Sequence, residues 1–423
     1  MFKTFMLICV LFFNMFCLAE DELLSVIVVF RHGARTPVEP YPNDPYKNAS
    51  YWPVGFGQLT DEGKRQHYDL GRWFRNRYNG FVPDKNFEKY IYVLSTDVDR
   101  TLMSAEANLA GFFPPEQEFH QNLLWQPIPI HTRQEKNDEI LAMKKECPKY
   151  NKLLEDLYRT AFLKNITHQY HDLYAYLARY SGSSVGNPDD VEYIYNTFTI
   201  ERSFNYTLPP WALKVFPDKM KYLASLSFAL YTYTPELIRL KTGPFFNLIT
   251  EHFINISSYS TGHHKHSKDN VWDRKLLIFS AHDTTIASIL NSMGLFDLHC
   301  PPFASTILFE LRKRQDNTTY LNLFYKNSSN PIQLCLKGCD LDCNLDKFIE
   351  ILKPIIISPR EWEEECTVNW FDFLPFGYKG NVMVITTLLS LTLFSLSFFL
   401  ALTCFKSKKQ SRALYQQLSS EET

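Results

Sequence analysis

Three short segments of the chain group residue types that could do chemistry on an anion. The first is Arg31–Pro37 (RHGARTP), in which two arginines flank one histidine in a glycine-containing turn. A guanidinium presents a planar fork of donors that matches phosphate or carboxylate oxygens. The histidine is badly placed for a metal ion, which the arginines would repel, but it is well placed to attack an anion that they hold. We therefore expect Arg31 and Arg35 to bind an anion and His32 to act as a nucleophile.

The second and third segments are Ser95–Thr101 (STDVDRT) and Ser280–Thr285 (SAHDTT). Arg100 would add a third guanidinium, His282 can donate to a phosphate oxygen, and Asp283 can deliver a proton to a leaving group. Each segment alone equally suits a loop in which an aspartate caps a helix and the arginine faces solvent.

The elements that precede these segments favour the chemical interpretation. Each segment follows a short apolar run typical of a buried strand: Leu24–Phe30, Tyr90–Ser95 and Lys275–Ser280. Helical patterns are expected at Thr60–Tyr78, Asp99–Phe113 and Thr284–Met293. Strands that alternate with helices indicate an α/β fold with a mostly parallel sheet. Ligands of such sheets bind beyond the carboxyl ends of the strands, where all three segments would lie.

The middle of the chain has a different pattern. From about 131 to 241 the strand signal fades and helix-like stretches dominate, such as Lys149–Leu163 and His168–Tyr180. We expect a smaller helical subdomain that covers the sheet.

Composition excludes several classes of protein. The 423 residues are 45% hydrophobic and 21% charged, which excludes wholesale disorder and a polytopic membrane protein. The net charge is −2, so nucleic acid is not an expected partner.

The two ends of the chain predict its compartment. Residues 1–19 read as a cleaved signal peptide, because Lys3 precedes the apolar run Phe5–Phe16; an N-terminal anchor helix is the alternative, but the run is short. Residues 382–404 carry no formal charge and are long enough to span a membrane. The basic residues that follow predict a cytosolic tail at 405–423 and a lumenal or extracellular body at 20–380, a type I arrangement. A GPI signal would instead end the chain with its hydrophobic tail.

The body has the marks of an oxidising compartment. Its six cysteines are an even number, which suggests three disulfides among 15 pairings. Zinc binding by three of the cysteines is the alternative, but their sequence lacks the CxxC spacing. Three clustered histidines in the polar loop 257–270 could also bind a metal, but histidines in such a loop are more often solvated. The cysteines are Cys147, Cys300, Cys335, Cys339, Cys343 and Cys366, and the histidines are His263, His264 and His266. Glycosylation sequons fall at Asn48, Asn165, Asn205, Asn255, Asn317 and Asn327.

At this point the sequence resembles a known family. The Arg31–Pro37 signature, the His282–Asp283 pair and the run 95–105 (STDVDRTLMSA) are similar to the histidine acid phosphatase branch of the histidine phosphatases. The resemblance covers most of the body and includes 55–60 (GFGQLT), Leu124–Ile130 (LWQPIPI) and Phe204–Pro209 (FNYTLP).

The resemblance implies a role for each candidate residue. His32 matches the nucleophile that becomes phosphohistidine, and Asp283 matches the proton donor. The phosphate-binding positions are Arg31, Arg35, Arg100 and His282. The family hydrolyses phosphate monoesters without a metal or other cofactor, on a phosphoglycerate-mutase-like α/β fold with a smaller helical domain. Aspartic acid has a reference pKa of about 3.9, so an acidic optimum is expected. The arginines lower the pKa of Asp283 and burial raises it, and the sequence leaves the balance open.

The resemblance also bears on the cysteines. It implies the disulfides Cys339–Cys343 and Cys147–Cys366. A third family pair is missing, since Arg202 and Thr306 lie where its cysteines would be. Cys300 and Cys335 are extra, and we expect them to form a compensating bond. Ala34 stands where many relatives have an acidic residue, which would alter the pH profile or the substrate range.

Partners and rival functions complete the sequence-based predictions. Tyr415–Leu418 (YQQL) has the form of an endocytic sorting signal for a cytosolic adaptor, and the family's homodimers suggest an interface near Trp125 and His131, with a buried loop as the alternative. We expect a lysosomal membrane or lumen, or the cell surface. The narrower rival is a lysophosphatidic acid or inositol polyphosphate phosphatase of the same superfamily. The non-enzyme rival is a catalytically inactive surface glycoprotein.

Overall fold

The computed structural model describes residues 21–83, 89–115, 120–260, 274–327, 329–367 and 379–420. The chain divides into two compact units, one that ends at Cys366 and one that begins at Thr367. The expected signal peptide at 1–19 and the three clustered histidines lie outside the described residues.

The first unit is built on one mixed sheet with the strand order β3-β2-β4-β1-β5-β6-β7, and β8 pairs with β6. The strands are β1 (Glu22–Arg31), β2 (Ile91–Thr96), β3 (His131–Arg133), β4 (Leu276–Ala281), β5 (Thr306–Lys313), β6 (Thr319–Lys326), β7 (Ile332–Leu334) and β8 (Cys343–Asn344). The α/β fold and the three predicted strands are confirmed. The half from β3 to β1 is parallel, as predicted, whereas β5 to β8 pair antiparallel. Short connections such as 314–318 cannot make a parallel crossover, which explains the mixed sheet.

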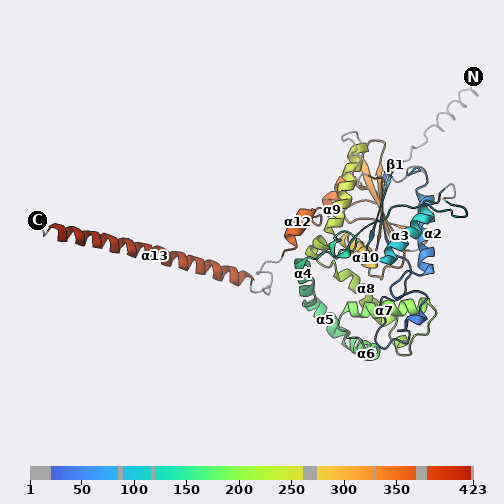
Figure 1. Cartoon of the computed structure of the whole chain (residues 1–423), viewed down its shortest axis with the longest axis horizontal. Coiled ribbons are helices and arrows are strands. Elements are labelled where there is room, and N and C mark those ends of the chain that lie inside the picture. The colour runs from blue at the N-terminus through green and yellow to red at the C-terminus, as the bar shows by residue number, and fades with distance from the viewer. Residues whose placement is uncertain are drawn as a thin grey trace, which may run out of the picture. The chain divides into compact units, whose positions relative to one another are not determined.

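Helices cover both faces of the sheet (Figure 1). Ile27 and Val29 of β1 pack in a core with α9, α10 and α11, whereas Val26 and Val28 face the opposite core with α2 and α3. This alternation follows from the two-residue period of a strand. The helices are α2 (Asp61–Arg77), α3 (Asp99–Phe112), α9 (Pro235–Ser260), α10 (Asp283–Ser292) and α11 (Leu345–Leu352). A further helix, α12 (Pro359–Glu365), contacts α9 and contributes Trp362 to a separate apolar core.

A helical part with its own apolar core lies at one end of the sheet (Figure 1). Its helices are α4 (Pro148–Tyr158), α5 (Ala161–Gln169), α6 (His171–Ser181), α7 (Pro188–Ser203) and α8 (Asp218–Leu230). The predicted range 131–241 contains these helices and also β3, which joins the sheet, and the start of α9 contributes Leu237 and Leu240 to the helical core. The helix expected at Lys149–Leu163 is broken, since Thr160 caps the start of α5.

Two disulfides tie the body, Cys147–Cys366 and Cys339–Cys343. The predicted Cys300–Cys335 bond is wrong, because both thiols are free. The Cys300 Sγ lies 3.9 Å from the Ser225 hydroxyl on α8, whereas the Cys335 thiol donates to the carbonyl of Cys339 at 3.3 Å. The two cysteines are therefore held in different surroundings.

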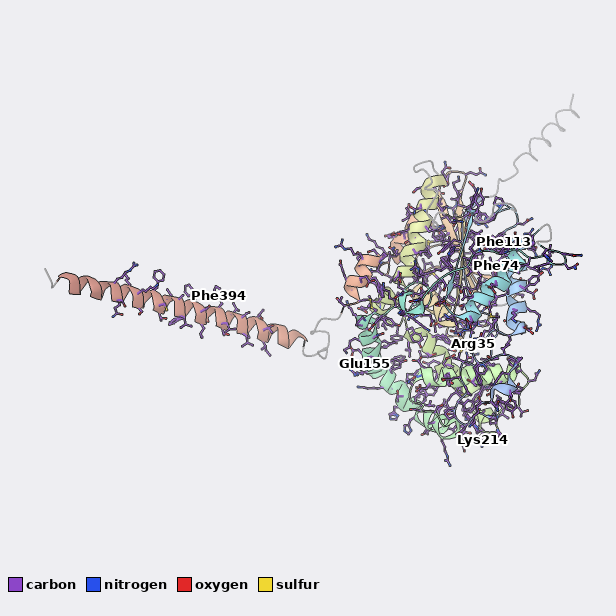
Figure 2. All side chains as sticks on the ribbon, viewed as in Figure 1. Arg35, Phe74, Phe113, Glu155, Lys214 and Phe394 are labelled. Carbon is purple, nitrogen blue, oxygen red and sulfur yellow. A yellow bond between two sulfur atoms is a disulfide. The ribbon has the colours of Figure 1, made fainter. Side chains whose placement is uncertain are left out.

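Apart from Thr367, the described residues of the second unit form one helix, α13 (Lys379–Ser420). Its stretch Val384–Arg412 is long and apolar enough to cross a membrane, and an 18-residue window within it has a mean hydropathy of 2.1. Apolar side chains such as Phe394 project outward from it (Figure 2). This stretch overlaps the predicted span at 382–404, and the backbone of Tyr415–Leu418 continues the same helix.

Candidate active site

The three predicted segments meet at one edge of the sheet. In the register of the parallel strands, Arg31 of β1 is opposite Ala281 of β4, and Ser95 of β2 is opposite Ser280. The chain therefore leaves all three strands at the same level, and the candidate residues follow directly. This is the ligand-binding edge expected of a parallel sheet.

Arg31 is held on three sides. It is 4% exposed, and its Nη2 lies 2.7 Å from Oδ2 of Asp283. Its Nη1 donates to the carbonyl of Pro301, and its guanidinium stacks 4.1 Å from the ring centroid of Phe303. These contacts fix the guanidinium in one orientation beside His32.

His32 is almost fully buried, and its tautomer follows from one hydrogen bond. Its Nδ1 lies 2.9 Å from the carbonyl oxygen of Gly33, which can only accept. Nδ1 therefore carries the proton, and Nε2 keeps its lone pair. Burial and the neighbouring cations, first Arg31 and then Arg100 and Arg35, hold the pKa of His32 well below its usual range. The imidazole thus stays neutral in acid.

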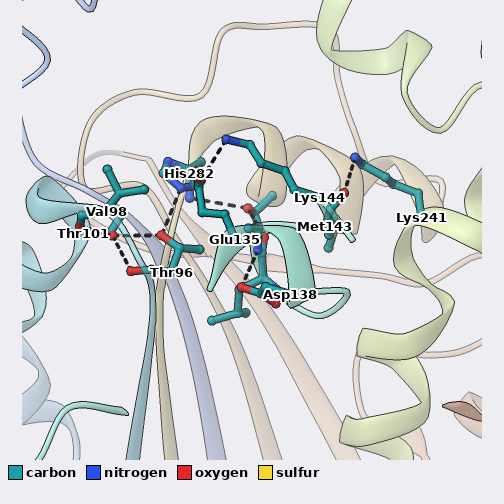
Figure 3. Close-up of polar contacts among 12 residues, drawn as sticks. Thr96, Val98, Thr101, Glu135, Asp138, Met143, Lys144, Lys241 and His282 are labelled. Atoms are coloured by element: carbon teal, nitrogen blue, oxygen red, sulfur yellow. Dashed lines mark hydrogen bonds and ion pairs between the residues drawn. The ribbon is translucent and has the colours of Figure 1, made fainter. Parts of the chain in front are cut away.

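His282 is oriented by a chain of hydroxyls (Figure 3). The Thr96 hydroxyl lies 3.0 Å from Nε2 of His282 and 2.8 Å from the hydroxyl of Thr101. The Thr101 hydroxyl in turn donates to the carbonyl of Val98 at 2.7 Å. The ring centroids of His282 and His32 are 5.7 Å apart. Burial and the charge of Arg100 lower the pKa of His282.

Asp283 is the first residue of α10, and its Oδ1 accepts the backbone N–H of Thr284 at 2.8 Å. Burial opposes ionisation of this carboxyl, but Arg31 and Arg35 outweigh burial and hold its pKa below the usual range. The balance that the sequence left open is therefore settled for the unliganded protein in favour of the arginines.

The arginine cluster has unsatisfied donors. The Nε atoms of Arg31, Arg35 and Arg100 are buried and have no hydrogen-bond partner in the described part of the chain. A buried donor without a partner is unfavourable, and a charged one more so. Burial and Arg31 lower the pKa of Arg35 only to about 10, so the cation persists. Three such donors around His32 make a site for an oxyanion.

The turn after β1 needs glycine and support from α2 and α3. A Cβ on Gly33 would lie 2.3 Å from the carbonyl oxygen of Gly63, so no other residue fits this close approach. The backbone N–H of Gly33 donates to Ser104, and Nε2 of His67 donates to the carbonyl of Arg31 at 3.0 Å. Burial lowers the pKa of His67 to about 4, so this support is uncharged.

Sequence reasoning missed several residues of the site. Asn196, on α7, accepts from Nη2 of Arg35 at 3.4 Å and donates to Glu192 at 3.3 Å. Lys144 lies beside His282 and pairs with Glu135 at 2.8 Å (Figure 3). No motif marks these residues, because the folding of separate segments brings them to the strand ends. Within the described residues no cluster of three or more metal-ligating side chains occurs.

The fold and the arginine cluster define an α/β protein with a histidine-centred oxyanion site. The model of the histidine phosphatase superfamily (branch 2) matches residues 22–326, and the chain belongs to this family. The resemblance inferred from the motifs is thereby confirmed.

Named relatives agree with this membership. The chain is 35% identical over 430 residues to lysosomal acid phosphatase of Xenopus laevis, with 98% of this chain and 94% of that protein covered. It is 36% identical over 357 residues to human prostatic acid phosphatase, with 82% and 88% covered.

Solved structures show the same fold. Hafnia alvei phytase in complex with tartrate matches with a TM-score of 0.61 at 18% identity, covering 83% of this chain and all of that one. Citrobacter braakii phytase matches with a TM-score of 0.60 at 20% identity, covering 82% and all of that chain. At such identities the likeness concerns architecture, not substrate.

Proposed function

We propose that this protein is an acid phosphatase that hydrolyses phosphate monoesters through a phosphohistidine intermediate. The observation that carries the proposal is His32, a buried neutral imidazole with a free Nε2 lone pair among three arginines. The names of the relatives, lysosomal and prostatic acid phosphatase, support the same activity.

Substrate binding would rest on the arginine cluster. Arg31, Arg35 and Arg100 would take the phosphate oxygens, which would satisfy their buried Nε donors. His282, oriented by Thr96, would complete the shell. The same donors would stabilise the charge that spreads over the equatorial oxygens in the transition state.

The chemistry would proceed in two steps. Nε2 of His32 attacks phosphorus in line, the bond from phosphorus to the ester oxygen breaks, and Asp283 protonates the departing alkoxide. Water then attacks the phosphohistidine, with Asp283 now accepting a proton. Arg31 binds both the substrate and Asp283, so it aligns the acid with the leaving group.

Substrate binding would also prepare the acid. In the free protein Arg31 and Arg35 hold the pKa of Asp283 low. A bound phosphate neutralises much of the guanidinium charge, which leaves burial as the dominant influence and raises that pKa. Protonation of Asp283 in the complex then requires a mildly acidic medium, so activity should peak in acid.

The test is to trap the intermediate. The full-length protein, purified in detergent with chelator present, is mixed with a labelled aryl phosphate and quenched in alkali, which preserves phosphohistidine. Wild type should retain label and hydrolyse the ester fastest in acid, whereas His32→Ala should do neither. Activity that survives in His32→Ala would refute the mechanism. A folded wild-type protein that is inert on every ester would favour the inactive-glycoprotein rival.

We further propose a type I protein of the secretory pathway, with a signal at 1–19, a body at 20–380, a span at 382–404 and a tail at 405–423. Five of the six sequon asparagines are exposed and Asn255 is partly exposed, so a glycosyltransferase could reach them. Both disulfides lie in the body, as a lumenal location requires. Loss of mass on glycosidase treatment, with the tail cleaved by cytosolic protease, would test this topology.

Two partners remain proposals. A cytosolic adaptor would bind Tyr415–Leu418, and Tyr415→Ala should then leave the protein at the cell surface; an unchanged distribution would end the idea. A homodimer would use the segment near Trp125, which is exposed together with Leu123 and Leu124. Sedimentation of Trp125→Ala should show dissociation. The narrower rivals, lysophosphatidic acid and inositol polyphosphates, belong in the substrate panel.

A further inference from the structure

Glu192 lies at the active site, and neither the motifs nor the mechanism above uses it. Its carboxylate accepts from Nδ2 of Asn196 at 3.3 Å, and Oδ1 of Asn196 accepts from Arg35 at 3.4 Å. Glu192 and Asn196 are four residues apart on α7, so they share one face of the helix. Through Arg35 that face is linked to the oxyanion site, at the boundary between the helical part and the sheet (Figure 2).

The charges around Glu192 come from two elements of the sheet part. Asp283 on α10 repels it, and Arg35 and Arg31, at the end of β1, attract it. Burial and the repulsion from Asp283 together raise the pKa of Glu192 to about 7 despite the arginines. The side chain is partly exposed, so a substrate could reach it.

Two more titratable groups face Glu192, and both are neutral. Tyr231 follows α8, and Cys300 lies in the loop after α10. Burial raises the pKa of Tyr231, and burial followed by repulsion from Glu192 raises that of Cys300 to about 12. Neither group adds charge between pH 5 and 8, so of these three groups only Glu192 changes its charge in that range.

We propose that Glu192, positioned by Asn196, selects phosphate monoesters by the charge of their alcohol. Alcohols with an ammonium group close to the ester oxygen are favoured, and alcohols with a carboxylate or further phosphates are disfavoured. The inference deepens the proposed function and rests on it. Its reason is placement: the arginines take the phosphate, and the partly exposed Glu192 is held through Asn196 against Arg35, so its carboxyl would lie beside the bound ester and act on the charge of the alcohol.

The size of the effect follows from Coulomb's law. Two unit charges a few ångströms apart still attract or repel each other appreciably at an effective dielectric constant of about 20, and solvent at a partly exposed group reduces this. A change of about tenfold in relative rate is therefore expected for each unit of charge on the alcohol. The discrimination should be weak at pH 5, where Glu192 is protonated, and full at pH 8.

The test uses three small phosphate monoesters. They differ in the group at the far end of a two-carbon alcohol, which is an ammonium, a hydroxyl or a carboxylate. They are 2-aminoethyl phosphate, 2-hydroxyethyl phosphate and phosphoglycolate, and the charge of each group is constant between pH 5 and 8. The measured quantity is kcat/KM for the full-length protein. The ammonium and carboxylate substrates differ by two units of charge, so in wild type the ratio of their rates should rise about a hundredfold from pH 5 to 8.

Three variants distinguish selection by Glu192 from a general loss of stability or activity. Glu192→Gln keeps the shape and the contact with Asn196, and its ratio should stay flat across the pH range. Asn196→Ala should give an intermediate slope, because Glu192 loses its positioning contact. The matched control is Glu155→Gln, which removes an exposed carboxylate from α4 (Figure 2) and should follow wild type.

The outcomes distinguish this inference from the proposed function. If none of the three esters is hydrolysed, the proposed function fails and this inference fails with it. If all three are hydrolysed and the wild-type ratio is flat from pH 5 to 8, or Glu192→Gln keeps the wild-type slope, only this inference is overturned. The wild-type measurement needs no variant, so it decides even if Glu192→Gln does not fold.

Discussion

Two buried carboxyl sites of this protein respond to burial in opposite ways. Asp283 lies beside Arg31 and Arg35, and its pKa is held low although burial opposes it. Asp44 and Glu201 are both buried and interact at the edge of the helical core, where no arginine pairs with either carboxyl among the described residues, and burial raises the pKa of both, that of Glu201 to about 9. Since both sites are buried, the arginines beside Asp283, which Glu201 lacks, account for the opposite directions of the two pKa shifts.

The difference matches two tasks. An ionised Asp283 can take a proton when a phosphate neutralises its arginines, so its state can change during turnover. At the Asp44–Glu201 pair, burial is the largest cause of both raised pKa values, and Lys47 only partly opposes it at Asp44. A protonated Glu201 should therefore favour the folded state in acid.

The largest expected effect is on the catalytic side of the comparison. Asp283→Asn keeps the size of the side chain and removes the proton. Hydrolysis of alkyl esters, whose alkoxides leave poorly, should fall by about 10²–10⁴ in kcat, whereas an activated aryl phosphate should lose about tenfold or less. Steady-state kinetics on both ester types would measure this. Equal losses on the two would argue against Asp283 as the acid.

A second prediction removes an arginine beside Asp283, so that the pKa of this carboxyl should rise, as that of Glu201 does. Arg31→Gln removes the partner 2.7 Å away, and breaking such a buried pair should destabilise the fold by about 3 kcal/mol at pH 7. In wild type the lowered pKa makes Asp283 stabilising above pH ~4 and less so as pH falls through its folded value. In the variant the pKa rises, so the loss should shrink in acid. Urea unfolding at pH 4 and 7 would measure it, and a loss independent of pH would contradict the argument.

Glu201 gives the third prediction, with the opposite sign. Its folded pKa of about 9 exceeds its ordinary value of about 4.5, so its contribution is full below pH ~4.5 and declines as pH rises toward 9. Between pH 5 and 7 this should remove about 2 kcal/mol from the free energy of unfolding. Glu201→Gln, which cannot ionise, should remove that part of the pH dependence. Urea titrations of both proteins would measure it, and parallel pH profiles would contradict it.

The sequence predicted one side of this comparison and not the other. Arg31, His32 and Asp283 were found because parallel strands end at one edge and each residue follows its strand directly. Asp44 and Glu201 carry no motif, and their contact spans the N-terminal loop and α7. The link from Arg35 to Asn196 crosses 161 positions and depends on how the helical part packs, which no local pattern encodes.

The errors have the same origin. Cys300 and Cys335 were paired to compensate for the missing family disulfide, but that reasoning contains no information about distance, and the two thiols contact Ser225 and the carbonyl of Cys339 instead. The buried apolar runs predicted the parallel half of the sheet. The antiparallel half was missed because β5 to β8 lie close together in sequence without the helices that a parallel crossover requires.

The smallest expected effect comes from a test of how much burial, and how much repulsion from Asp44, raises the pKa of Glu201. Asp44→Asn keeps the oxygen that accepts from the backbone N–H of Tyr46 and removes the charge that faces Glu201. Burial is the larger cause of the raised pKa of Glu201, so about half of the pH dependence, ~1 kcal/mol between pH 5 and 7, should remain. The same urea titrations would measure it, with Asp61→Asn as a control at an exposed carboxyl. Complete loss of the pH dependence in Asp44→Asn would mean that repulsion, and not burial, keeps Glu201 protonated, and the contrast with Asp283 would then be one of neighbouring charge alone.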